Sequence, residues 1–183
     1  MRLDNVISGA YTRDDGFGTR QLIEDAALGH VEVLDLVPAL ATPSGERAIR
    51  ARVEQLEGTG APLVAPAYRL EGRADVLSLV SAAVDGVPLC ELLAAVEFGT
   101  LTLPDDAVLE LAATTDRAVA EVHQPLGPLS HGAVNAAHII LQRGGRVVLT
   151  DAVFGEALQQ LELNRDELWR RFSLANSRSS ART

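Results

Sequence analysis

The most restrictive part of the sequence is a polar loop followed by two short apolar segments, between residues 131 and 151. The apolar segments are Ile139-Ile140-Leu141 and Val147-Val148-Leu149. The residues between them, Gln142-Arg143-Gly144-Gly145-Arg146, are typical of a β-hairpin turn. Thr150-Asp151 follows the second segment directly. This stretch therefore predicts a small hairpin with a polar loop before it and one carboxylate after it.

The rest of the chain reads as strands first and helices later. Strands are expected at 20–24, 30–37, 63–70 and 75–84, with a turn at 14–18. Ser44 is expected to cap a helix that begins near Gly45 or Glu46 and ends before Gly58. Further helices are expected at 89–95, 105–123 and 158–172. In the long helix at 105–123, the residues expected to face a core are Val108, Leu111, Ala112, Ala118, Val119 and Val122.

Composition indicates one globular domain and excludes two kinds of partner. The chain has 183 residues and is 47% hydrophobic, which is enough to build one core. A net charge of −9 argues against nucleic acid, because phosphate contacts need clustered Lys and Arg. No apolar run has the length of a bilayer span, so no membrane association is expected. With one cysteine, Cys90, and no secretory signal, the default location is the cytoplasm.

The chain contains no lysine, since all 16 basic residues are arginine. This absence excludes every mechanism that needs a lysine amine or ammonium. Schiff-base catalysis and lysine-assisted phosphate binding are the main examples.

The loop and hairpin at 131–151 resemble the catalytic loop and metal-binding segment of protein kinases. His131-Gly132-Ala133 and His138 fall at the positions of the family's H-R-D-L-x-x-x-N pattern. Asp151, thirteen residues beyond His138, is similar to the aspartate that begins the D-F-G motif. Bacterial serine/threonine kinase-like domains are the relatives that this spacing suggests.

The N-terminal half agrees with the resemblance in outline. Gly16-Phe17-Gly18-Thr19 is similar to the end of a glycine-rich loop, and residues 31–36 to the strand that carries the ATP-binding lysine. The resemblance implies an α+β fold: a protein-kinase-like N-lobe with an antiparallel sheet plus one helix, then an incomplete, mainly helical C-lobe with a catalytic-loop hairpin. The implied divisions are 1–84 (N-lobe-like), 85–175 (partial C-lobe-like) and a polar, frayed tail at 176–183.

Most charged groups that the family uses for phosphoryl transfer are missing. The lysine position falls on Leu34 or Asp35, and Arg52 stands where the matching helix has its glutamate. The position of the proton-accepting aspartate is Ala133, whose methyl group cannot act as a base. Asp151 alone keeps its place. The resemblance therefore implies a domain without catalytic residues.

Four residues remain as candidates for a site. Gly16 and Gly18 fit either a phosphate cradle or an ordinary tight turn. Asp151 and His138 fall at the two metal-ligand positions, although imidazole suits zinc or copper better than magnesium. Asp151 also fits a loop-capping carboxylate. No cofactor is expected, with weak residual binding of ATP and Mg or Mn left open.

Two other combinations are disfavoured. Ser130, His131 and Asp151 lack the glycine pattern around the nucleophile of a hydrolase triad. His123, His131 and His138 are separated by Gly and Pro residues that break a common helical face, which disfavours a zinc site.

Only 32 residues follow Asp151, fewer than a complete kinase C-lobe needs. We therefore expect the helix at 105–123 to carry an apolar face that a dimer partner or another protein covers. Cys90 is expected to be a small residue of the core. Trp169 is expected to anchor its helix to the domain or to a partner. The leading hypothesis is a non-catalytic, pseudokinase-like binding or scaffolding module. The alternatives are a weak phosphotransferase that uses Asp151 and His138 with a divalent metal, and a nonfunctional truncated gene product.

Overall fold

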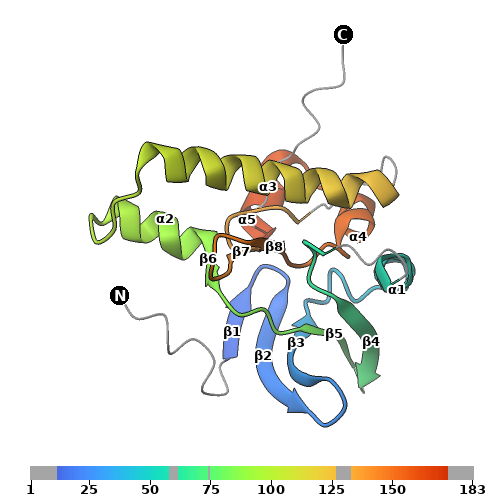
Figure 1. Cartoon of the computed structure of the whole chain (residues 1–183). Helices are drawn as coiled ribbons and strands as arrows, with labels where there is room; N and C mark the ends of the chain where they lie inside the picture. The colour runs from blue at the N-terminus through green and yellow to red at the C-terminus, as the bar shows by residue number, and fades with distance from the viewer. Residues whose placement is uncertain (1–11, 58–61, 74, 127–132, 173–183) are drawn as a thin grey trace.

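The computed structural model describes residues 12–57, 62–73, 75–126 and 133–172, so that His131 and the predicted tail at 176–183 lie outside it. A five-stranded antiparallel sheet forms the N-terminal part, with the strand order β1-β2-β3-β5-β4 (Figure 1). Its strands are β1 (Thr12–Asp15), β2 (Gly18–Asp25), β3 (Gly29–Leu36), β4 (Ala67–Arg73) and β5 (Val76–Ala82).

Helix α1 (Pro43–Glu57) lies between β3 and β4 in the chain and packs against β4. Its predicted apolar face is confirmed, because Ile49, Val53 and Leu56 are all buried. The predicted cap is wrong by two residues: the hydroxyl of Thr42, rather than that of Ser44, accepts a hydrogen bond from the amide of Gly45. Pro43 then begins the helix, where its missing N–H costs nothing.

The described residues of the second part form a small sheet and four helices. Strands β6 (Val87–Pro88), β7 (Ile139–Leu141) and β8 (Val147–Leu149) pair in that order, so the predicted hairpin is confirmed with Ile139 opposite Leu149. Val64 bridges to Leu149 and links the chain before β4 to this sheet. The helices are α2 (Leu89–Glu97), α3 (Asp105–Leu126), α4 (Gly155–Gln160) and α5 (Arg165–Phe172). No helix in the described ranges has the length and apolarity needed to cross a membrane.

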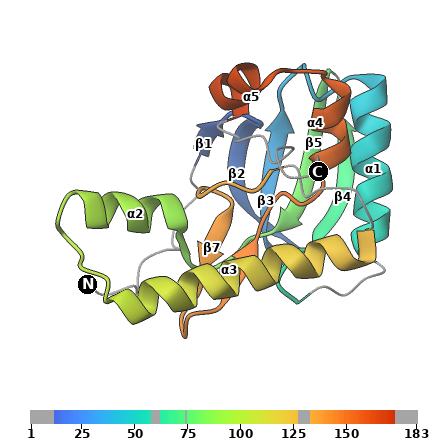
Figure 2. The same cartoon turned by 90° about the horizontal axis from the view of Figure 1, so that it is seen from above.

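Helices α2 and α3 project away from the rest of the molecule at their connecting turn (Figures 1 and 2). In α3, Ala118 is fully buried, but Val108 and Ala112 are exposed, so the predicted core face is covered only in part. The side chain of Val122 lies outside the described residues. Cys90 on α2 is half-buried, which corrects its placement in the core.

Three boundaries differ from the sequence expectations. Residues 12–15 form a strand because they pair with β2, although their polar residues favour a turn. The strand expected at 63–70 is displaced to 67–73. The helix expected at 158–172 is two helices, because Glu162 adopts a positive φ of 51° and Asn164 caps α5, accepting a hydrogen bond from the amide of Glu167 at 3.0 Å.

One aromatic side chain from the large sheet is buried in the core of the second part. Phe17, in the turn between β1 and β2, is fully buried, and its ring centroid lies 4.7 Å from that of Phe154 and 5.3 Å from that of Phe172. Phe154 precedes α4 and Phe172 ends α5. The α+β arrangement expected from the sequence is therefore present, with the turn of the large sheet inserted into the core of the second part.

Candidate functional site

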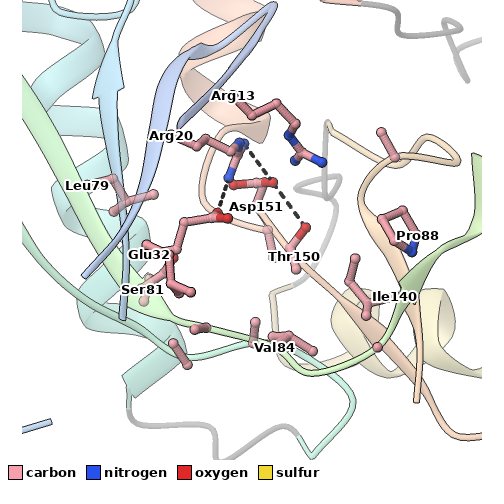
Figure 3. Close-up of a pocket in the computed structure, with 18 of the residues that line it drawn as sticks. Arg13, Arg20, Glu32, Leu79, Ser81, Val84, Pro88, Ile140, Thr150 and Asp151 are labelled. Carbon is pink, nitrogen blue, oxygen red and sulfur yellow. Dashed lines mark hydrogen bonds and ion pairs between the residues drawn. The ribbon is translucent and has the colours of Figure 1, made fainter. Parts of the chain in front are cut away.

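A cavity of about 290 Å3 lies between the large sheet and the β6–β8 sheet. Arg13, Arg20, Glu32, Thr150 and Asp151 gather at one end of it, and its other walls are mainly apolar (Figure 3). The cavity is the place where the two parts of the fold meet. The groups that can act on a ligand are therefore carried by both parts.

Arg20 lies at the centre of the polar end. Its guanidinium pairs with three carboxylates: Nε with Asp15, Nη1 with Glu32 at 2.5 Å, and Nη2 with Oδ2 of Asp151 at 3.0 Å. Only 1% of Arg20 is exposed. Because ion pairs are strongest where water is excluded and several hydrogen bonds are made, this cluster fixes Asp151 to the large sheet.

The charges in the cluster shift the pKa values in the directions expected for ion pairs. Burial alone would lower the pKa of Arg20, but Asp151, Glu32 and Asp15 together raise it. Burial likewise favours the neutral form of Asp151, yet Arg20, His138 and the hydroxyl of Thr150 hold its pKa below the ordinary value. Asp151 is therefore a carboxylate at neutral pH, and its charge is already compensated inside the protein.

His138, the second predicted metal ligand, is brought next to Asp151. Its Nδ1 lies 2.8 Å from the carbonyl oxygen of Ala133, and its Nε2 lies 3.6 Å from Oδ2 of Asp151. That same Oδ2 accepts hydrogen bonds from Arg20 and from Thr150, both at 3.0 Å. Magnesium prefers an octahedron of oxygen ligands, so this donor set fits it poorly.

Within the described residues, no three His, Cys, Asp or Glu side chains are arranged to hold a metal ion. The assignment of Asp151 and His138 as metal ligands stays a prediction.

The two predicted cofactor-binding glycines, Gly16 and Gly18, flank Phe17 and do not line the cavity. A side chain at Gly16 would meet the backbone of Arg171, and one at Gly18 would meet the carbonyl of Asp35. Close packing therefore requires glycine at both positions.

The amide groups of the same turn are also engaged. Oδ1 of Asp15 accepts hydrogen bonds from the amides of Phe17 and Gly18, at 2.8 and 3.2 Å. A glycine-rich loop binds phosphate through such amides. Here a carboxylate of the chain itself already occupies them, so the turn is closed by its own side chain.

A cation, Arg20, lies next to the position at which the resemblance places the ATP-binding lysine. Leu34 is buried in the core, and Arg20 is its direct cross-strand partner on β2, so both side chains lie on the same face of the sheet. Asp35, the alternative position, accepts a hydrogen bond from the hydroxyl of Ser78 at 2.6 Å. Arg52 donates to the carbonyl oxygen of Ala152 and to Oε1 of Gln55, both at 3.3 Å.

Sequence reasoning missed Arg20. In the structure Gly18, Arg20 and Leu22 share the buried face of β2. The sequence contains no clear signal for this, because Arg20 is polar and Ile23 on the opposite face is as apolar as Leu22. The sequence had no means of identifying its partners. Glu32 belongs to the next strand, and Asp151 lies 131 residues further along the chain.

Arg13 is a second cation in the cavity and lies directly opposite Arg20 in the β1–β2 pair. Among the described residues, its buried Nε has no hydrogen-bond partner. Its side chain points into the cavity from above the Arg20 cluster (Figure 3). Arg13 was not singled out by the sequence either.

Comparison with known proteins supports the fold. No protein-family model matches the chain, and no curated protein matches it significantly in sequence. Among solved structures, the kinase domain of maize SIRK1 (sucrose-induced receptor kinase 1), bound to AMP-PNP, is similar with a TM-score of 0.61 and 18% identity, over 81% of this chain and 55% of that domain. Structures of the Mycobacterium tuberculosis PknI kinase domain give TM-scores of 0.56 and 0.59 with 20% and 19% identity, over 78% and 84% of this chain and 56% and 63% of theirs.

The chain thus has a protein-kinase-like fold and spans between 55% and 63% of the length of these kinase domains. At these identities the likeness concerns the fold alone.

Proposed function

We propose that this chain is a non-catalytic, pseudokinase-like binding module that acts in the cytoplasm and derives from a bacterial serine/threonine kinase-like domain. The observation that carries the proposal is the engagement of Asp151 by Arg20. In phosphoryl transfer the aspartate at this position holds the metal that bridges the phosphates. Here it is neutralised by a buried arginine, and Ala133 offers no base.

The closed turn supports the same conclusion. Its amides bind Asp15 instead of remaining free for phosphate. For ATP and magnesium to bind in the manner of a kinase, both Asp15 and Asp151 would have to leave buried or half-buried ion pairs with Arg20. Such a rearrangement costs about 3–5 kcal/mol per broken buried pair.

Two measurements test the proposal. The first is a thermal-shift titration with ATP and magnesium or manganese on the wild type and on Asp151→Asn, each compared with its own ligand-free melting temperature. The second is ADP release from ATP with a generic protein substrate. We expect no stabilisation that depends on Asp151 and no ADP above a blank without protein.

A clear stabilisation that disappears in Asp151→Asn, accompanied by ADP release, would instead support a weak phosphotransferase that uses Asp151 and His138. Arg50→Gln provides the control for the thermal shift, because Arg50 is exposed on α1 and forms an ion pair with Glu46.

A further inference from the structure

The segment from α2 to the middle of α3, residues 89–116, combines acidic residues with exposed apolar side chains. It contains six acidic residues and no basic one. Large apolar side chains are exposed along it, above all Phe98, at 79%, and Leu109, at 71%. The same segment includes the turn that projects from the molecule (Figure 2). We call residues 89–116 the acidic arm.

Exposed large apolar residues framed by like charges are typical of interaction surfaces. Glu97 adjoins Phe98, and Asp106 and Glu110 flank Leu109 in sequence, all of them exposed. An occupant of the acidic arm therefore needs an apolar group to cover Phe98 or Leu109, together with cations for the carboxylates.

Helix α5 carries the complementary chemistry. Trp169, the only tryptophan of the chain, is 61% exposed. Arg165 lies one helical turn before it and Arg170 lies next to it, both exposed. The helix also carries Asp166 and Glu167 in its first turn and Arg171 in its last, so arginines outnumber acidic residues by one. Tryptophan and arginine are the side chains most enriched among residues that dominate binding energy at protein interfaces.

We propose that the acidic arm binds helix α5 of a second copy of this chain, with Trp169 as the apolar anchor and Arg165 and Arg170 facing the acidic residues. In Figure 2, α5 and the α2–α3 arm lie at different edges of the molecule. The contact is therefore heterologous, so that each copy offers one surface of each kind and molecules associate head to tail. This inference rests on the proposed function, since it names the partner of the binding module.

Sedimentation velocity over a concentration series tests the proposal on the full chain. The variants are Trp169→Ala, which removes the anchor, and the double variant Phe98→Ser with Leu109→Ser, which removes the apolar part of the arm. Leu28→Ser is the matched control, because Leu28 is an exposed apolar residue on the turn between β2 and β3. Circular dichroism establishes that each variant is folded.

We expect the wild type and the control to associate with concentration, and less so as salt is added. Trp169→Ala and the arm variant should each associate at least ~10-fold more weakly. Mixed together, the two variants should form dimers of one copy of each and nothing larger, because Trp169→Ala keeps an intact arm and the arm variant keeps an intact α5.

A wild type that stays monomeric across the series would overturn the proposal, as would a mixture that sediments like its separate components. These outcomes leave the absence of catalysis untouched, because ADP release is measured independently of association. Conversely, ADP release by a chain that associates as expected would overturn the proposed function and keep the interface.

Discussion

At the scale of residues, Arg20 decides what the cavity can do. It lies opposite Leu34, close to where the resemblance expects a lysine, and it is surrounded by Asp15, Glu32 and Asp151. The corresponding lysine of a kinase pairs with the phosphates of ATP and with a helix glutamate. Arg20 instead donates its hydrogen bonds to carboxylates of the chain, so its guanidinium stabilises the folded protein.

We predict that Arg20→Met lowers the free energy of unfolding by about 3–5 kcal/mol, because removing one partner leaves buried carboxylates unpaired. Urea unfolding followed by circular dichroism measures the change. Arg50→Met is the control and should cost no more than about 0.5 kcal/mol, since Arg50 forms an exposed pair with Glu46 on α1. Equal losses in the two variants would contradict a structural role for the Arg20 cluster.

The lowered pKa of Asp151 predicts a pH dependence of stability. A carboxyl group whose pKa is lower in the folded than in the unfolded state stabilises the folded state above its ordinary pKa of 3.8. That contribution is lost as the pH falls through the folded-state value. We therefore expect the stability advantage of the wild type over Asp151→Asn to be full near about pH 6 and to shrink below about pH 4.

Free energies of unfolding in urea, measured for both proteins over this pH range, check the expectation. Parallel curves for the two proteins down to the lowest pH would show that Asp151 is not a source of the acid sensitivity.

At the scale of elements, the hairpin of β1 and β2 is shaped by close packing at both of its glycines. The carbonyl of Asp35 leaves no space for a side chain at Gly18, whose φ of 151° is also unfavourable for other residues. Asp15 closes the turn from within. The two glycines of Gly-Phe-Gly thus permit the close packing that buries Phe17. A glycine pattern alone does not distinguish this structural role from a phosphate-binding loop.

We predict that Gly18→Ala lowers the free energy of unfolding by about 3 kcal/mol, because the backbone of β3 must shift to admit the methyl group. Gly72→Ala on β4 is the matched control: nothing lies within 4 Å of the added carbon, so the change should be neutral or slightly stabilising. Thermal and urea unfolding of the two variants measure the difference. A Gly18→Ala protein as stable as Gly72→Ala would refute the packing argument.

At the scale of the whole molecule, several long-range contacts hold the two parts together, including the packing of α1 against α4 and the bridge between Val64 and Leu149. Phe17 packs on Phe154 and Phe172, and Arg20 pairs with Asp151. The contacts of Phe17 and Arg20 originate from the β1–β2 hairpin. Docking of this hairpin therefore contributes to the cooperative unfolding of the large sheet with the helices that follow β8.

We predict that the wild type unfolds in one transition, with the same midpoint by far-ultraviolet circular dichroism and by the fluorescence of Trp169, which reports on α5 alone. Phe17→Ala removes a buried aromatic ring and should lower stability by about 3–5 kcal/mol. It should also separate the two midpoints, with the fluorescence change first. Coincident midpoints in Phe17→Ala would show that other contacts couple the two parts.

The sequence by itself determined the features that depend on neighbouring residues. The hairpin at 139–149 follows from two apolar runs around a glycine turn, and the buried face of α1 follows from the spacing of Ile49, Val53 and Leu56. The spacing from His138 to Asp151 indicated the kinase-like fold, and the structure brings those two side chains to 3.6 Å from each other. The predicted division at residue 84 stays a prediction.

Only the tertiary structure decided how Arg20, Phe17 and Asp15 are used. Arg20 finds Asp151 across 131 residues, and Phe17 finds the ends of α4 and α5. Local periodicity determines which way a side chain points, but the partner on the other side depends on how distant elements dock. A buried ion pair is stabilising or destabilising according to the partners that surround it. The ionisation of Asp151 therefore depends on the docking that brings Arg20 next to it.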